Sequence, residues 1–312
     1  MTTLLVNDER LECRVVGHGP TLVLVHANIS DIRSWEPIEA LLAENFRVIN
    51  YSRRYAHPNR PIPAGADDPL EVHVEDLVSL IEAQAEGPVH LLGCSSGAFI
   101  SLLVATRRPD LVASLSLEEP PVVSMFVGSL PPRVSDMVRL LLTDPDAVLA
   151  FAKFGARTMS PAVKAFQRGD DEAALDAFCE GVLGRQAYRR VTAGRRQQML
   201  DNLAPHRAAL LRPGLPAFTP AQARALTVPT QLIRGASTSH FQRRVNQRLA
   251  ALVPGARDVV VGHASHLVHE DNPADVARAV LELAGRTGPA AGRHPQSQAG
   301  DRPTERSSSL RP

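Results

Sequence analysis

The chain has 312 residues, of which 44% are hydrophobic and 21% charged, and its formal net charge is +1. This composition is typical of a soluble globular protein and leaves room for one large α/β core with an inserted subdomain. The balanced charge argues against binding to nucleic acid or to a membrane surface, and no apolar run reaches the roughly 20 residues that span a bilayer.

The cysteines and the first residues of the chain indicate the cellular compartment of the protein. Cys13, Cys94 and Cys179 are spaced neither as a disulfide framework nor as a zinc site, and free thiols are typical of a reducing cytosol. The first residues mix acidic and basic side chains and lack the long apolar run of a signal peptide. We therefore expect a cytoplasmic protein.

Segments with strand signals alternate with segments of helical periodicity. The strands are short β-branched or continuous apolar runs, as expected for strands buried on both faces. The predicted strands are residues 3–6, 13–16, 21–26, 46–51, 89–93, 112–117, 229–235 and 257–261. The predicted helices between and after them are residues 34–44, 72–83, 96–106, 241–252 and 273–284. This alternation predicts an α/β fold with a mostly parallel, eight-stranded sheet and helices on both faces.

The alternation is interrupted by a long helical stretch, residues 121–226. Its predicted helices are residues 134–142, 145–154, 161–166, 171–183 and 197–203. Roughly a hundred helical residues are too many for a crossover between two strands, so we interpret them as an inserted helical cap. The core then comprises residues 1–120 and 227–284. Residues 285–312 are rich in Gly, Pro, Ser and Arg, lack apolar periodicity and are expected to be a disordered tail.

The most informative motif is Gly93-Cys94-Ser95-Ser96-Gly97. The pattern Gly-x-Ser-x-Gly alone occurs by chance in many chains, but here it follows a predicted buried strand and precedes a predicted helix. That context is the one a nucleophile elbow requires. Ser95 would lie at the tip of a strained turn, and the first N–H groups of the helix would face a developing oxyanion. The alternative is a serine that merely caps an ordinary helix.

A serine hydroxyl is a poor nucleophile until a base takes its proton. The loop after the last predicted strand reads Gly262-His263-Ala264-Ser265-His266. Its place in the chain favours His266 as the base, with His263 and the more distant His269 as alternatives to a purely structural histidine.

Together, the segment Gly93–Gly97, the strand end Val23–His26, His266 and the closing helix resemble the α/β-hydrolase superfamily. More narrowly, the chain is similar to capped bacterial hydrolases of the esterase, lactonase and epoxide-hydrolase-like type. The resemblance covers about residues 3–284 and implies the α/β-hydrolase fold with a Ser–His–acid triad. Dehalogenases and epoxide hydrolases of this fold carry an Asp at the elbow, so Ser95 argues against both.

The position of the acid that would orient His266 departs from the commonest pattern of the family. The family usually places an Asp shortly after the strand that follows the cap, where this chain reads Gly235–His240 without an acid. Some members carry it at the end of the strand after the elbow helix, which here ends in Glu118 and Glu119. Because successive side chains on a strand alternate faces, only one of them can point at His266. We choose Glu119, with Glu118 or a Ser–His dyad as the alternatives.

The resemblance also implies an oxyanion hole and a substrate pocket. The donors would be the backbone N–H groups of Ser96 and Asn28, with Ala27, which replaces the usual Gly, as the alternative to Asn28. Arg54 is expected to anchor the loop after residue 51 through ion pairs. Candidate substrate contacts, each also compatible with simple packing, are Tyr55, Met125, Phe126 and Phe154.

These residues predict a serine hydrolase of the carboxylic ester hydrolase type, without cofactor or metal. It would cleave an ester, lactone or thioester of a hydrophobic small molecule through an acyl-enzyme on Ser95. The alternatives are a tailoring enzyme of bacterial secondary metabolism that uses the same triad for deacylation, C–C cleavage or cyclisation, and a non-catalytic ligand receptor. We expect a monomer or homodimer with no nucleic-acid or membrane partner.

The composition of the tail generates a first prediction. Truncation after Arg286 should leave the melting temperature and hydrolytic activity nearly unchanged, because a Gly-, Pro-, Ser- and Arg-rich segment buries little apolar surface. Thermal unfolding and ester turnover of the two lengths of chain are the measurements. A large drop in either quantity would show that the tail docks on the fold or on a partner.

Overall fold

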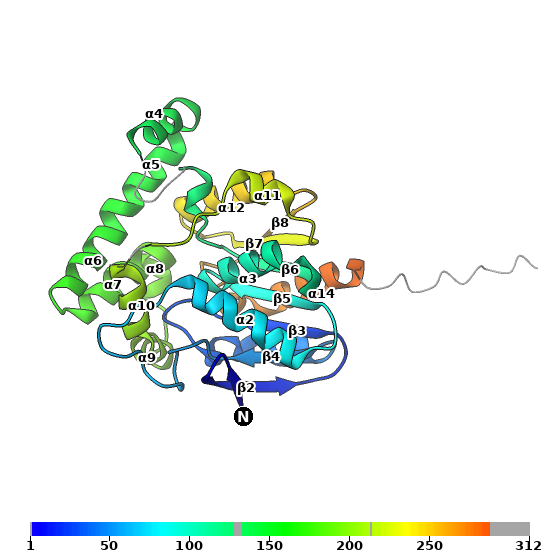
Figure 1. Ribbon diagram of the computed structural model, residues 1–312. Helices are drawn as coiled ribbons and strands as arrows, with labels where there is room; N and C mark the ends of the chain where they lie inside the picture. The colour runs from blue at the N-terminus through cyan, green and yellow to red at the C-terminus, as the bar shows by residue number, and fades with distance from the viewer. Residues whose placement is uncertain (1, 128–132, 213, 288–312) are drawn as a thin grey trace, which may run out of the picture.

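The computed structural model describes residues 2–127, 133–212 and 214–287 and contains one eight-stranded sheet in the order β1-β2-β4-β3-β5-β6-β7-β8 (Figure 1). β2 pairs antiparallel with β1 and β4, and the pairs from β4 through β8 are parallel. The strands are β1 (Thr2–Val6), β2 (Glu9–Val16), β3 (Thr21–Val25), β4 (Arg47–Tyr51), β5 (Val89–Cys94), β6 (Val112–Glu118), β7 (Thr230–Gly235) and β8 (Arg257–Val261). The predicted mostly parallel sheet is confirmed.

Helices cover both faces of this sheet. Buried residues of α2, α3 and α12 share one apolar cluster with one side of the sheet, and those of α1 and α14 share the other. The core helices are η1 (Ile32–Trp35), α1 (Glu36–Ala43), α2 (Leu70–Gln84), α3 (Ser96–Arg107), η2 (Pro109–Leu111), η3 (Val123–Met125), α12 (His240–Leu252), α13 (Val268–Asp271) and α14 (Pro273–Thr287).

Some element boundaries differ from the expected ones. β2 begins at Glu9 and not at residue 13. In its first part, Arg10 and Glu12 lie on the less buried face and alternate with buried residues. Such polar positions are compatible with a strand that has one solvated face, although they interrupt the apolar run in the sequence. The helix expected from residue 34 begins as the 3₁₀ turn η1, and α1 starts only at Glu36, with a proline in its first turn. The closing helix continues to Thr287, past the expected start of the tail at residue 285. The rest of that predicted tail lies outside the described residues.

A helical insertion separates β6 from β7, as predicted; α4 to α8 of this insertion form the protruding lobe in Figure 1, whereas α11 lies beside α12. Buried residues of α6, α7 and α9 form a small apolar cluster of their own. The described helices after η3 are α4 (Val134–Thr143), α5 (Pro145–Phe154), α6 (Ser160–Gln167), α7 (Asp171–Leu183), α8 (Arg185–Tyr188), α9 (Ala193–Asp201), α10 (Leu203–Leu211) and α11 (Pro220–Ala225), with the π-helical turn η4 (Gly155–Met159) between α5 and α6. Residues 128–132 and 213 of the predicted cap lie outside the described residues. The short helices α8 and α11, and the proline-containing α10, were not expected.

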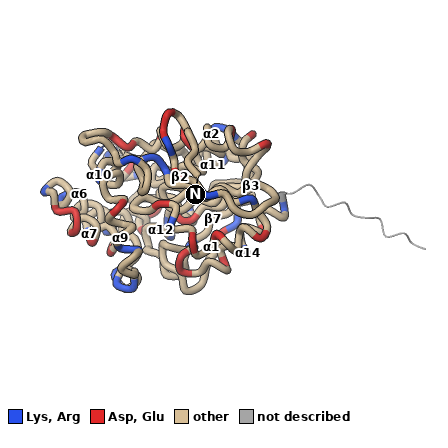
Figure 2. The backbone as a smooth tube through the Cα atoms, turned by 90° about the horizontal axis from the view of Figure 1, so that it is seen from below, with Lys and Arg blue, Asp and Glu red and all other residues tan. Residues whose placement is uncertain are grey.

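Charged residues of both signs are distributed over the view in Figure 2, in keeping with the balanced net charge. None of the helices in the described part of the chain is both long and apolar enough to cross a membrane.

The start of α3 packs directly on the end of β3. A Cβ atom at Gly97 would lie 2.0 Å from the carbonyl oxygen of Val25 and 2.5 Å from that of His26. Real Cβ atoms do not approach backbone oxygens so closely, so only glycine permits this packing. The second glycine of the elbow motif thus places the loop after β3 against the first turn of α3.

Gly97→Ala should destabilise the protein by about 1–3 kcal/mol or more, because the added methyl group must force β3 and α3 apart. Gly194→Ala in α9 is the matched control, since a Cβ atom there meets nothing within 4 Å and should be neutral or slightly stabilising. Chemical unfolding curves provide the comparison. Equal stability of the two variants would contradict the close packing.

Candidate active site

The chain turns sharply at Ser95 between β5 and α3. Ser95 has φ 51° and ψ −116°, a strained conformation of the kind that concentrates at active sites. Its backbone N–H donates a 2.7 Å hydrogen bond to the carbonyl oxygen of Glu118 at the end of β6. The Ser95 side chain makes no capping hydrogen bond to α3, so the alternative of an ordinary capping serine is not supported. The geometry matches the predicted elbow.

The loop after β8 brings His266 over the end of β7. The N–H of Ser237 donates to the carbonyl oxygen of Ala264 at 2.9 Å, and a Cβ atom at Gly235 would lie 2.2 Å from the carbonyl oxygen of Ser265. The loop backbone therefore rests directly on the glycine that ends β7. This packing carries His266 across β7 towards the end of β6.

The carboxylate of Glu119, directly after β6, contacts the ring of His266. Its Oε2 lies 2.7 Å from Nδ1 of His266, and both side chains are buried. The same carboxylate accepts a 3.0 Å hydrogen bond from the N–H of Gly235 and a 2.7 Å bond from Oγ1 of Thr238. The expected contact between Glu119 and His266 is therefore present. It fixes the ring so that Nε2 is directed away from the acid.

Two side chains of this network were not predicted. Thr238 comes from the segment Gly235–His240, which contains no acid. Gln242 of α12 places its Nε2 3.4 Å from Nδ1 of His266. Among the described residues, no hydrogen bond joins Ser95 to His266; catalytic hydrogen bonds are often long in unliganded enzymes.

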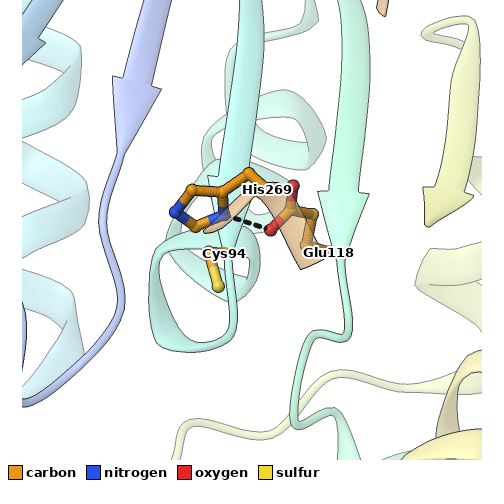
Figure 3. Close-up of side chains that lie close together, drawn as sticks. All are labelled: Cys94, Glu118 and His269. Atoms are coloured by element: carbon orange, nitrogen blue, oxygen red, sulfur yellow. Dashed lines mark hydrogen bonds and ion pairs between the residues drawn. The ribbon is translucent and has the colours of Figure 1, made fainter. Parts of the chain in front are cut away.

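Glu118, the alternative acid, points to the opposite face of the sheet. Its Oε2 lies 2.6 Å from Nδ1 of His269, the alternative base, whose ring stacks on Trp35 with centroids 3.9 Å apart. Figure 3 shows this pair beside Cys94. Burial alone would lower the pKa of His269, but the Glu118 carboxylate raises it above its usual value. Glu118 at the end of β6 and Glu119 directly after it thus each contact a different histidine.

The cluster of Cys94, Glu118 and His269 has ligand types that could hold a metal ion, with candidate ligand atoms within 4.8 Å of one another. Its geometry fits a shared proton better. The 2.6 Å separation between Glu118 and His269 is shorter than the roughly 3.4 Å expected between two ligands of a tetrahedral zinc ion. Burial raises the pKa of the Cys94 thiol well above its usual value, which favours the neutral thiol.

Asn28 and Ser96 lie together at the start of α3. Ser96 is the first residue of that helix, so its backbone N–H has no intrahelical acceptor. The side-chain Oγ of Ser96 donates to Oδ1 of Asn28 at 2.9 Å. The following residue, Ile29, has φ 49°, which is rare for a β-branched residue, and it packs into the apolar cluster of the cap. The loop that would supply the second oxyanion donor is thus held from both sides.

The four candidate substrate contacts do not converge on one cavity. Met125 and Phe126 line a cavity of about 450 Å³, whose lining includes neither the candidate nucleophile nor the candidate base. Phe154 stacks on Phe241 with centroids 4.0 Å apart. Tyr55 is half-buried in the loop after β4 with φ 64°. Met125 and Phe126 are themselves buried, so their observed role is packing between core and cap.

Polar side chains that the sequence did not single out attach the cap to the core. The buried carboxylate of Asp31 accepts 2.9 and 2.7 Å hydrogen bonds from Gln198 and Asn202. Burial opposes its ionisation, yet Arg33 and Asn202 hold the pKa of Asp31 below its usual value. Arg195 forms a 2.9 Å ion pair with Glu270. These contacts fix the cap beside the loops that carry Asn28 and His266.

Two proteins that are similar in sequence are named as hydrolases. The chain is 27% identical over 276 residues to a 2-(acetamidomethylene)succinate hydrolase of Mesorhizobium japonicum, a match that covers 88% of this chain and 91% of that protein. It is 28% identical over 128 residues to an uncharacterized hydrolase, YraK, of Bacillus subtilis, which covers 41% of this chain and only 47% of that protein.

Solved structures share the fold at low sequence identity. A thermophilic esterase from Thermogutta terrifontis superposes with a TM-score of 0.69 at 18% identity, over 92% of this chain and 98% of that one. An enol-lactonase from Burkholderia xenovorans gives a TM-score of 0.65 at 19% identity, over 90% and 99%. A model of the alpha/beta hydrolase family matches residues 22–279. With its elbow, sheet order and helical insertion, the chain belongs to the α/β hydrolase family.

Proposed function

We propose that the protein is a serine hydrolase that cleaves an ester, lactone or thioester of a hydrophobic small molecule. The observation that carries the proposal is the 2.7 Å contact between Glu119 Oε2 and His266 Nδ1, together with the strained backbone of Ser95 at the elbow between β5 and α3. A carboxylate at Nδ1 keeps Nε2 available as a base and stabilises the imidazolium that forms. The ester and lactone activities named for the structural neighbours are consistent with this chemistry.

The proposed mechanism assigns one role to each residue. Ser95 Oγ attacks the substrate carbonyl while Nε2 of His266 takes its proton. The backbone N–H groups of Asn28 and Ser96 hold the oxyanion, and His266 then protonates the leaving group. Water, activated by the same histidine, releases the acyl group from Ser95. The cap excludes bulk water and selects the substrate by shape.

Deacylation, C–C cleavage or cyclisation in a tailoring pathway would use the same triad but differ in the bond that breaks or in the group that accepts the acyl. A non-catalytic receptor would bind its ligand in the same site without turning it over. A chromogenic short-chain ester assay separates an enzyme from a receptor, and soaking of candidate ligands would address the substrate.

Ser95→Ala should abolish ester turnover, because loss of the nucleophile removes several kcal/mol of transition-state stabilisation. A fluorophosphonate probe should label the wild-type protein at Ser95 alone, which peptide mass spectrometry can locate. Retention of more than a few per cent of the activity by the Ala variant would show that the nucleophile lies elsewhere.

Glu119→Gln should keep the fold and lower kcat by orders of magnitude, because an amide does not stabilise the imidazolium as a carboxylate does. Glu118→Gln at the neighbouring position is the matched control. Since Glu118 contacts His269 on the other face, its substitution should affect stability more than kcat. Steady-state kinetics and thermal unfolding of both variants distinguish the two roles. If Glu119→Gln retained near wild-type kcat, a Ser–His dyad would replace the proposed triad.

A further inference from the structure

Arg53, two residues after the end of β4, is a buried cation that the proposed mechanism does not use. Its side chain is only 6% exposed. Its Nη2 donates to the carbonyl oxygen of Ala27 at 3.1 Å and to Oδ1 of Asn28 at 3.0 Å, and it lies 3.5 Å from Oγ of Ser96. One guanidinium nitrogen therefore contacts both segments that carry the proposed oxyanion donors.

The contact with Ala27 bears directly on the N–H of Asn28, because the two groups belong to one peptide unit. In a trans peptide the C=O and the N–H point in opposite directions. The carbonyl oxygen of Ala27 also lies 2.8 Å from Nδ1 of His26, whose Nε2 accepts the backbone N–H of Arg53 at 2.8 Å. Since Nε2 accepts, Nδ1 carries the proton and donates to Ala27. Two donors on this oxygen fix the peptide plane and thus the direction of the Asn28 N–H.

The charge of Arg53 is not neutralised by a close carboxylate. No Asp or Glu of the described residues lies within ion-pair distance of its guanidinium, and burial lowers the pKa of Arg53. Its neighbour Arg54, by contrast, forms ion pairs with Asp76 and Glu9, as expected for an anchor of the loop. A positive charge in a site of low dielectric acts strongly on nearby dipoles.

The free side of Arg53 offers little room for a substrate. The cavity that it lines with His73 and His206 holds about one water molecule. A direct contact between the guanidinium and a substrate group therefore has less support than an action through the Ala27–Asn28 peptide.

We propose that Arg53 is a positioning residue for the oxyanion hole, which orients and polarises the Ala27–Asn28 peptide so that the Asn28 N–H stabilises the tetrahedral intermediate. The inference rests on the proposed serine-hydrolase function.

The test compares Arg53→Met with Arg53→Lys and with the control Arg54→Met. We expect Arg53→Met to lower kcat about 10- to 100-fold with little change in KM, less than the loss of a direct oxyanion donor. Arg53→Lys, which keeps a charged donor beside Ala27, should recover part of that loss. Arg54→Met should lower the melting temperature and leave kcat within about twofold of wild type.

A second readout uses inhibitors that differ only in the oxyanion. A trifluoromethyl ketone, which adds to Ser95 and forms an oxyanion, should bind Arg53→Met more weakly than wild type by a factor similar to the loss in kcat. The corresponding carbinol, which forms none, should bind both proteins equally. Equal trifluoromethyl ketone affinity in the two proteins, or a matching loss for the carbinol, would overturn the role of Arg53. If the wild-type protein neither hydrolysed esters nor reacted at Ser95, the proposed function would fail, and this inference with it.

Discussion

The candidate site depends on one buried carboxylate, that of Glu119. It accepts hydrogen bonds from the Gly235 N–H and the Thr238 hydroxyl and contacts Nδ1 of His266. These partners come from the end of β7 and from the loop after β8, while Glu119 itself follows β6. A buried carboxylate is stable only when such donors compensate for its lost hydration. The same three contacts therefore stabilise the charge and hold the proposed base in one orientation.

The parallel sheet explains why residues so distant in sequence meet. Ser95 follows β5, Glu119 follows β6 and His266 lies after β8, and the carboxyl ends of parallel strands share one edge of the sheet. Glu118 is the last residue of β6, and Glu119 follows it with a φ of 47°, so that the two carboxylates reach different histidines. Glu119 serves the candidate site, whereas Glu118 forms a buried pair with His269 under the elbow. The structure thereby holds two buried acid–histidine pairs, Glu119 with His266 and Glu118 with His269.

The cap is attached to the core by contacts of two kinds. Polar contacts at Asp31 and Glu270 join α9 to the loops near Asn28 and His266, and ring stacking joins Phe154 to Phe241 of α12. Phe241 immediately precedes Gln242, which approaches His266. A change in the position of the cap would thus alter the surroundings of the candidate base. The cap and the proposed base are connected through neighbouring residues of α12.

The sequence by itself determined the local features. Continuous apolar runs and their alternation with helical periodicity predicted the sheet and its helices, because buried parallel strands require such runs. The position of Gly93–Gly97 between a strand and a helix predicted the elbow at Ser95. The adjacent Glu118 and Glu119 predicted the place of the acid that would orient the histidine. The tertiary structure decided which partners those residues have. Strand pairing and the path of the loop over Gly235 assign Glu119 to His266 and Glu118 to His269, and only folding brings Arg53, Thr238 and Gln242 to the site. The type of each residue and the spacing of apolar residues along a segment can be taken directly from the sequence. A contact between segments more than a hundred residues apart depends on how the whole sheet assembles.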